Sequence, residues 1–156
     1  MELPIDDKAT LRGKIVFAGV GNVLKGDDGF GALLAQAIED EVSFKVFDTG
    51  MAPENYLGVI VGAKPDTIIF ADTGDFGGAP GEIKLFRAEE FTDSSFYLTH
   101  NTSLKMLFQF IDMEGLNAEV YVLCSQPSSM ALGDELSEEV SKGIRMLSEW
   151  FISNFS

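Results

Sequence analysis

The sequence predicts a three-layer αβα fold, in which a mostly parallel five-stranded sheet with one antiparallel strand lies between two layers of helices. Short β-branched apolar runs alternate along the chain with segments whose apolar residues recur at helical spacing, a pattern typical of parallel sheets covered on both faces. One connection between neighbouring strand runs is too short for a parallel crossover. The length of 156 residues suits one hydrophobic core, so we expect a single α/β domain over residues 1–156.

Five apolar runs have the length and composition of buried strands. They are IVFAGVG at 15–21, FKVFD at 44–48, TIIFAD at 67–72, EIKLF at 82–86 and AEVYVLC at 118–124. Nine glycine-rich residues separate the third run from the fourth, whereas a parallel crossover needs a dozen or more. The fourth run is therefore predicted to be the antiparallel strand.

Four segments have the periodicity of amphipathic helices. Their predicted inward-facing residues are Leu33, Leu34, Ala37 and Ile38 in the first, Tyr56, Leu57, Ile60 and Val61 in the second, Leu104, Leu107, Phe108 and Ile111 in the third, and Val140, Ile144, Leu147 and Phe151 in the last. Pro53 suits the start of the second helix and Asn101 the cap of the third. The polar, acidic segment before Gly13 predicts a solvated N-terminal extension over residues 1–13.

Composition and charge narrow the classes of partner. Hydrophobic residues make up 46% and charged residues 23%, which is the balance of a chain that folds. The net charge of -14 opposes nucleic acids and anionic membranes and favours cations or basic peptides. The single cysteine, Cys124, excludes an internal disulfide and suits a reducing compartment. With neither a signal-peptide pattern nor a membrane-spanning apolar run, we expect a cytoplasmic protein.

Acidic residues follow the predicted parallel strands, where open α/β sheets bind their ligands. Asp27 and Asp28 follow the first strand, Asp48 ends the second and Asp72 the third, while the only histidine, His100, opens a helix. Two carboxylates and one imidazole make a hard-to-borderline metal site with open positions, which metal-assisted hydrolysis requires.

Each of these residues also has a purely structural interpretation. Asp28 could cap a helix, Asp72 could close a turn at the end of a strand, and His100 could satisfy a helix N-terminus. Cys124 could be a soft ligand or a nucleophile, but a small buried hydrophobic residue is the favoured interpretation. These alternatives stay open at the level of the residues alone.

Two further motifs suggest functions that their details oppose. The glycine loop at 19–31 resembles a phosphate cradle, but it matches neither GxGxxG nor GxxxxGK[ST], and its two aspartates would repel a phosphate. The Asp-Thr-Gly triplets at 48–50 and 72–74 are similar to the aspartic protease motif, but 24 residues cannot hold the β-rich lobe that separates such motifs. We interpret both triplets as turns at the ends of strands, which glycine permits.

Four segments occur in an order and at a spacing that are highly specific in combination, and a fifth, SQP, follows the last predicted strand. They are GVGNVLKGDDGFG at 19–31, DTGMAPEN at 48–55, FADTGDFGGAPGEI at 70–83, THN at 99–101 and SQP at 125–127. In these segments the chain resembles the hydrogenase maturation proteases, endopeptidases that trim the C-terminus of nickel-iron hydrogenase large subunits. The resemblance covers residues from about 15 to 150. The N-terminal extension and Cys124 depart from the family pattern.

The resemblance implies a nickel-dependent endopeptidase that removes the C-terminal extension of a nickel-loaded hydrogenase large-subunit precursor. It implies that Asp28, Asp72, His100 and Asp48 are catalytic and that the first three contact the metal. Asp48 is expected to support recognition or cleavage, and its carboxylate is our candidate for the group that accepts the proton. Nickel is expected to arrive with the precursor, the protein partner, and no organic cofactor is expected. We expect a monomer that binds neither nucleic acid nor membrane.

Two alternatives come from other functional classes. A non-enzymatic nickel-dependent checkpoint or assembly factor would grip the precursor with the same residues without cutting it. A small nucleotide-binding module would instead bind adenine nucleotides independently of metal.

Overall fold

The computed structural model describes residues 3–5, 7–92, 97–98 and 101–156. The strands are β1 (Ile15–Gly19), β2 (Lys45–Asp48), β3 (Thr67–Asp75), β4 (Ile83–Arg87), β5 (Tyr97–Leu98) and β6 (Glu119–Ser125). The α-helices are α1 (Phe30–Ile38), α2 (Leu57–Gly62), α3 (Asn101–Met113) and α4 (Glu138–Phe155). Short 3-10 helices are η1 (Lys8–Thr10), η2 (Gly26–Gly29), η3 (Pro53–Tyr56) and η4 (Ala88–Thr92).

The central sheet has the order β2-β1-β3-β6-β4. β1 pairs in parallel with β2 and β3, and β3 pairs in parallel with β6. β4 pairs antiparallel with β6, which confirms the prediction made from the short connection after β3. The two-residue strand β5, which the sequence did not reveal, pairs antiparallel with the end of β3. The predicted mostly parallel α/β sheet with one antiparallel strand is thus confirmed.

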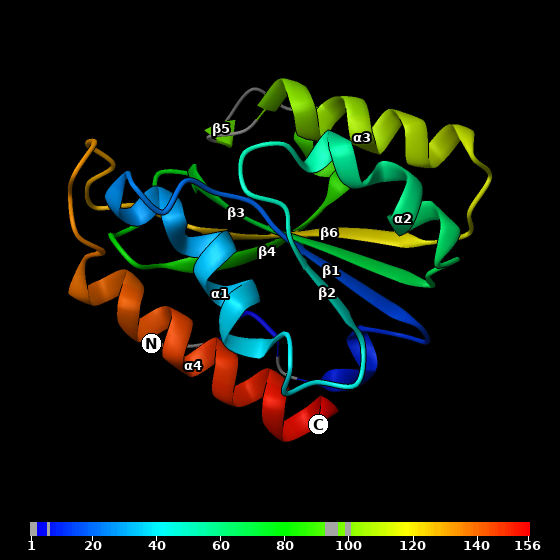
Figure 1. The fold of residues 1–156 in the computed structure, drawn as a ribbon, viewed down its shortest axis with the longest axis horizontal. Coiled ribbons are helices and arrows are strands. Elements are labelled where there is room, and N and C mark those ends of the chain that lie inside the picture. The colour runs from blue at the N-terminus through cyan, green and yellow to red at the C-terminus, as the bar shows by residue number, and fades with distance from the viewer. Residues whose placement is uncertain (1–2, 6, 93–96, 99–100) are drawn as a thin grey trace.

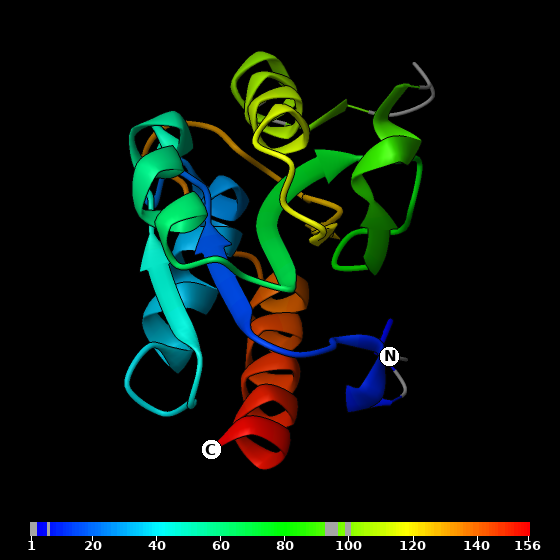
Figure 2. The same cartoon turned by 90° about the vertical axis from the view of Figure 1, so that its right-hand side faces the viewer.

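Helices cover both faces of the sheet, with α1 and α4 on one side and α2 and α3 on the other (Figure 1). The view along the sheet in Figure 2 shows α4 below the strands and α3 above them. Each face has its own hydrophobic cluster, because successive residues of a strand point to opposite faces. Phe17 and Leu123 belong to the cluster under α1 and α4, while Phe70 and Val122 belong to the cluster under α2 and α3.

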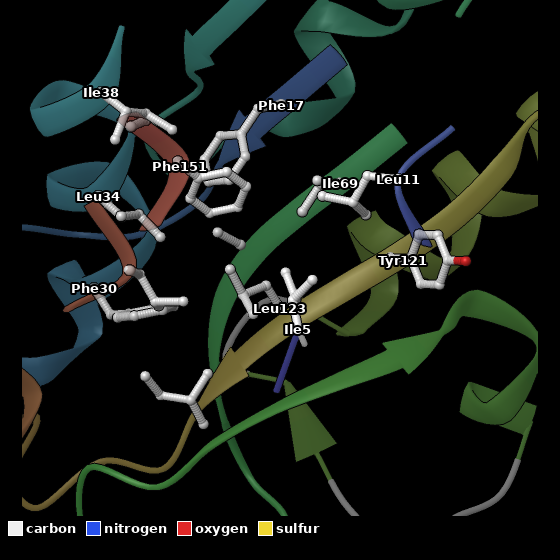
Figure 3. Close-up of a cluster of buried hydrophobic side chains, with 14 of the residues drawn as sticks. Ile5, Leu11, Phe17, Phe30, Leu34, Ile38, Ile69, Tyr121, Leu123 and Phe151 are labelled. Carbon is white, nitrogen blue, oxygen red and sulfur yellow. The ribbon is translucent and has the colours of Figure 1, made fainter. Parts of the chain in front are cut away.

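Two apolar residues of the N-terminal segment are packed, which corrects part of the prediction of a solvated extension, whereas residues 7–10 and 12–13 are exposed as predicted. Ile5 and Leu11 are buried in the cluster that also holds Tyr121 and Leu123. Figure 3 shows their side chains beside Leu123 and Tyr121 of β6. Ile5 and Leu11 lie six positions apart with mostly polar residues between them, so they form no helix or strand period, which is why the sequence pattern missed them.

Two local predictions were wrong. β3 continues through Thr73 and Gly74 to Asp75, so the second Asp-Thr-Gly triplet lies within a strand and forms no turn. The first triplet does turn, with Gly50 at φ +58°. The second wrong prediction concerns Ala37, which is exposed and does not face the core. The buried face of α1 begins at Phe30, earlier in the chain than predicted, and the helix ends at Ile38. Within the described residues, no helix has the length and apolarity needed to cross a membrane.

Candidate active site

The turn that carries Asp28 lies close against the ends of β1 and β3, because two positions at this contact are glycines without a side chain. A Cβ atom on Gly31 would lie closer than 3.0 Å to the carbonyl oxygens of Ala71 and Val20, and one on Gly19 would meet the carbonyl of Gly31. Real Cβ atoms essentially never approach so closely. Glycine at these two positions therefore lets the start of α1 touch the strand ends.

Hydrogen bonds fasten this region on both sides of Asp72. The N–H of Val20, which follows β1, donates to the carbonyl of Ala71 at 2.8 Å. The hydroxyl of Thr73 donates to the carbonyl of Asp27, also at 2.8 Å. Because Ala71 and Thr73 flank Asp72, and Asp27 adjoins Asp28, the structure brings the turn of Asp28 to the end of β3 that holds Asp72.

The Asp28 carboxylate is buried and only half satisfied. Its Oδ2 accepts a hydrogen bond from the N–H of Asn22 at 3.2 Å. Its Oδ1 is buried and has no hydrogen-bond partner among the described residues. A buried carboxylate oxygen without a donor or cation is costly, so this atom marks a place where a positive group would be stabilised.

Asp72 is fully buried near the carboxyl end of β3. Its Oδ1 accepts a hydrogen bond from the N–H of Thr73 at 2.8 Å. By the alternation of the strand, Asp72 shares the face of Phe70, which packs toward α2 and α3. The interpretation as a simple turn-closing residue does not fit, because β3 does not turn there.

The neighbouring aspartate, Asp27, has a structural role, because both of its carboxyl oxygens accept hydrogen bonds from backbone N–H groups. Its Oδ1 accepts from the N–H of Ser137 at 2.7 Å, and its Oδ2 accepts from the N–H groups of Ser128 and Ser129 at 2.8 and 3.2 Å. Asp27 thus ties the loop after β6 to the turn before α1. The sequence left open which of the two aspartates starts the helix, and only the hydrogen bonds separate their roles.

Asp48 lies at the same edge of the sheet but further away. It pairs with Gly19 of β1, and Gly19 pairs on its other side with Ala71, so two strand spacings, about 10 Å, separate β2 from β3. Its carboxylate accepts hydrogen bonds from Gln36 of α1 at 2.9 Å and from the N–H of Gly50 at 3.1 Å. This carboxylate therefore faces α1, on the other side of the sheet from Asp72.

His100 lies outside the described residues. The residues nearest to it in the chain that are described are Leu98, which pairs with Gly74 of β3, and Asn101, where α3 begins. Within residues 3–5, 7–92, 97–98 and 101–156, no three His, Cys, Asp or Glu side chains converge closely enough to hold a metal ion. The predicted three-residue metal site thus stays a prediction.

Comparison with known proteins decides the family. Residues 31–154 match the sequence model of a family described as hydrogenase maturation protease. The chain belongs to this family. The protease is 33% identical over 140 residues to a putative hydrogenase maturation protease of Methanocaldococcus jannaschii, covering 83% of this chain and 88% of the relative. It is 30% identical over 127 residues to the hydrogenase 3 maturation protease of Escherichia coli K12, covering 80% of each chain.

Solved structures agree with this assignment. The crystal structure of the [NiFe] hydrogenase maturation protease HycI from Thermococcus kodakarensis superimposes with a TM-score of 0.78 at 30% identity, covering 90% of both chains. The HybD endopeptidase of Escherichia coli, at 24% identity and a TM-score of 0.75, shares the fold. The predicted family and activity class, a protease of hydrogenase maturation, are confirmed.

Cys124 of the protease is a buried structural residue, as favoured from the sequence. It pairs in register with Asp72 and packs in the cluster under α2 and α3. Burial raises the pKa of its thiol strongly, and the nearby carboxylates of Asp72 and Asp75 raise it further. A thiol held in its protonated form is a poor nucleophile and a poor metal ligand.

Gln126, in the SQP segment, has a structural role that the sequence did not reveal. Its Oε1 accepts from the N–H groups of Phe76 and Gly78 at 2.9 and 3.1 Å, and its Nε2 donates to Asp75 at 3.1 Å. The N–H of Gly77 and the amide of Gln126 lower the pKa of Asp75. Gln126 therefore fixes the loop after β3 in the protease.

The glycine loop before α1 uses its N–H groups internally. The N–H of Asn22 donates to Asp28, that of Asp27 to the carbonyl of Ser129, and that of Asp28 to the carbonyl of Lys25. A phosphate cradle needs such groups to be free for the ligand. This geometry disfavours the nucleotide-binding alternative.

Proposed function

We propose that the protease is a nickel-dependent endopeptidase that removes the C-terminal extension of a nickel-loaded hydrogenase large-subunit precursor. The observation that carries the proposal is the buried Oδ1 of Asp28, which has no partner among the described residues and lies in a turn fastened around Asp72. Carboxylate oxygens suit hard and borderline divalent cations. The residues present therefore fit a metal ion carried by the substrate.

We infer that His100 is the third ligand. Leu98, two residues earlier in the chain, pairs with Gly74, which lies two residues beyond Asp72 on β3. The helix that follows, α3, begins at the same end of the sheet (Figure 1). These described neighbours in the chain support our choice of His100, and a ligand set of one imidazole and carboxylates suits nickel.

An open site of two carboxylates and one imidazole would let the protease distinguish a nickel-loaded precursor from an empty one. Such a site binds free metal weakly, so a precursor that already carries nickel completes it and an empty precursor does not. A divalent ion in this position supplies Lewis-acid polarisation of the scissile carbonyl and a lowered pKa for bound water. Asp28 and Asp72 supply buried carboxyl oxygens that would help to hold such an ion.

Asp48 takes a supporting part in this proposal. The hydrogen bond that it accepts from the N–H of Gly50 holds the turn there, and the one from Gln36 joins it to α1. The N–H of Gly21 in turn donates to the carbonyl of Gly50 at 2.8 Å. The loop after β2 is thereby joined to the loop that leads to Asp28. In this proposal Asp48 shapes the edge of the sheet where the precursor would bind. It does not bind the metal, which Asp28, Asp72 and His100 would contact.

The strongly acidic chain supports the choice of substrate. Its net charge of -14 attracts a basic C-terminal segment over a distance set by the ionic strength. We place the reaction in the cytoplasm, in keeping with the single cysteine, and with the protein acting as a monomer.

The test is mass spectrometry of a candidate precursor after incubation with the protease. The nickel-loaded precursor should lose one C-terminal peptide, and the nickel-free precursor should stay intact. Cleavage of both forms at the same rate contradicts nickel dependence. Binding of the loaded precursor without any peptide product would favour the checkpoint factor over the endopeptidase.

A further inference from the structure

Among the described residues, three large exposed apolar side chains lie in the two loops that Asp27 holds together beside the candidate active site. Val23 and Leu24, in the loop between β1 and η2, are 48% and 66% exposed, and Leu132, in the loop between β6 and α4, is 76% exposed. We call these three residues the apolar rim. The hydrophobic effect favours burying such side chains, so exposed apolar residues gathered in one place mark interaction surfaces.

Hydrogen bonds hold the two loops of the apolar rim together. The N–H of Gly133 donates to the carbonyl of Leu24 at 2.9 Å, which places Leu24 beside the residue that follows Leu132. The buried carboxylate of Asp27 binds three N–H groups of the loop that contains Leu132. Figure 1 shows this orange loop next to the blue segment that leads into α1.

The rim is also joined to the candidate metal ligand. The side-chain Oδ1 of Asn22 accepts from the N–H of Leu24 at 3.0 Å. The backbone N–H of the same Asn22 donates to the carboxylate of Asp28 at 3.2 Å. A single residue thus connects the backbone of Leu24 to the carboxylate of Asp28, so the rim adjoins the candidate metal ligand.

We propose that the apolar rim binds apolar side chains of the precursor segment that flanks the scissile bond. This inference rests on the proposed function, because it takes the hydrogenase precursor as the occupant of the site. The continuity of the rim with Asp28 through Asn22 supports this occupant. Three side chains cover far less than the ~800 Å² per partner that a stable protein dimer buries, which argues against a second copy of this chain.

The rim and the net charge have different parts in recognition. The charge of -14 accelerates the encounter with a basic segment, but it is spread over the whole chain. Apolar contacts beside the bond instead fix which peptide segment stays bound, since they act only at short range. Binding by the rim should therefore be insensitive to salt.

The experiment compares Leu24→Ser/Leu132→Ser with a matched control, Met113→Ser. Met113 is 78% exposed at the C-terminal end of α3, away from the candidate site. Cleavage of nickel-loaded precursor is followed by mass spectrometry over a range of precursor concentrations. The double variant should raise KM at least tenfold at both low and high salt, with kcat unchanged within about twofold, and the control should match the unmodified protease.

Several outcomes would overturn the inference. An unchanged KM in the double variant, or an equal rise in the control, would exclude binding by the rim, and so would a fall in kcat at constant KM. Dimers of the unmodified protease that the double variant abolishes in sedimentation would assign the rim to self-association. If the double variant is less folded by circular dichroism, Leu132→Ser alone carries the test, with a smaller rise in KM expected. Failure of the unmodified protease to cleave would refute the proposed function instead.

Discussion

Gly31 tests whether close packing of α1 against the strand ends builds the site. In Gly31→Ala, the new Cβ would meet the backbone nitrogen of Val20 at 2.7 Å, and the carbonyl oxygens of Val20 and Ala71 would lie closer still. Ordinary contact begins near 3.4 Å, so clearing the Val20 nitrogen takes about 0.7 Å, and clearing the Ala71 carbonyl oxygen requires α1 to retreat from β3 by more than about 1 Å. No flexible side chain can absorb this overlap, because all three atoms belong to the backbone. The turn that carries Asp28 moves with it.

The magnitude follows from two opposing effects. Overpacking against rigid surroundings costs about 3 kcal/mol, at the upper end of the usual range, because every close atom belongs to the backbone. Replacing glycine by alanine within a helix normally gains about 1 kcal/mol. The net loss of about 2 kcal/mol corresponds to a decrease in Tm of about 4–8 °C for a chain of this size.

The matched control is Gly58→Ala in α2. A Cβ atom there would meet nothing within 4 Å, so the substitution keeps only the gain in helix propensity and should raise Tm by about 2 °C. Thermal unfolding followed by circular dichroism measures both variants. Cleavage of the nickel-loaded precursor should fall about 100-fold in Gly31→Ala, since misplacing a reacting group by about 1 Å has such an effect, and stay unchanged in Gly58→Ala. Equal Tm values and equal cleavage rates in the two variants would refute the packing argument.

Three other predictions concern residues around the site. The raised pKa of Cys124 keeps its thiol protonated, so iodoacetamide at pH 8 should leave the native protease unmodified and alkylate it in urea; rapid alkylation of the native protein contradicts its burial. Asp48→Asn keeps an oxygen for the N–H of Gly50, so kcat should fall less than about fivefold, whereas a loss of 100-fold or more would make Asp48 a proton acceptor. In Gln126→Ala, the pKa of Asp75 should rise toward its ordinary value in an NMR titration, because one of the two hydrogen bonds that lower it is lost; an unchanged pKa would assign the whole effect to Gly77.

The linkage between Asp75 and stability has a definite sign. Because its folded-state pKa is lowered, the hydrogen-bonded loop after β3 stabilises the protein fully above the ordinary carboxyl pKa. That contribution is lost as the pH falls through the lowered pKa. Gln126→Ala should therefore reduce the difference in Tm between neutral and acidic solution.

The alternation of strands and helices was predictable because it depends on residue periodicity alone. The antiparallel direction of β4 was predictable because the number of residues in the connection before it can be counted in the sequence. β5 has two residues, too few for a pattern, and its pairing partner on β3 is distant in the chain. The continuation of β3 through Gly74 depends on that same pairing, so the sequence suggested a turn instead.

The sequence was enough to predict which loops form the candidate site, but not which side-chain atoms in those loops are hydrogen-bonded. Parallel topology places the residues that follow β1 and β3 at one edge, which points to Asp28 and Asp72. Adjacent aspartates look alike in sequence, however, and only three-dimensional contacts separate them: Asp27 accepts from three N–H groups, whereas one oxygen of Asp28 has no partner in the part of the chain that the structure describes. The tie between Gln126 and Asp75 likewise depends on contacts between distant segments.

The most direct measurement of the central claim is a comparison of Asp28→Asn with Asp27→Asn for both Tm and cleavage of the nickel-loaded precursor. Asp28→Asn replaces a buried carboxyl group, one oxygen of which has no partner among the described residues, and it keeps an acceptor for Asn22. The account therefore predicts a Tm at or above that of the unmodified protease and no detectable C-terminal peptide. Asp27→Asn weakens three hydrogen bonds of a buried carboxylate and should lower Tm by several degrees. Normal cleavage by Asp28→Asn, or loss of its activity only together with loss of its fold, would contradict the assignment of Asp28 as a ligand for the metal of the precursor.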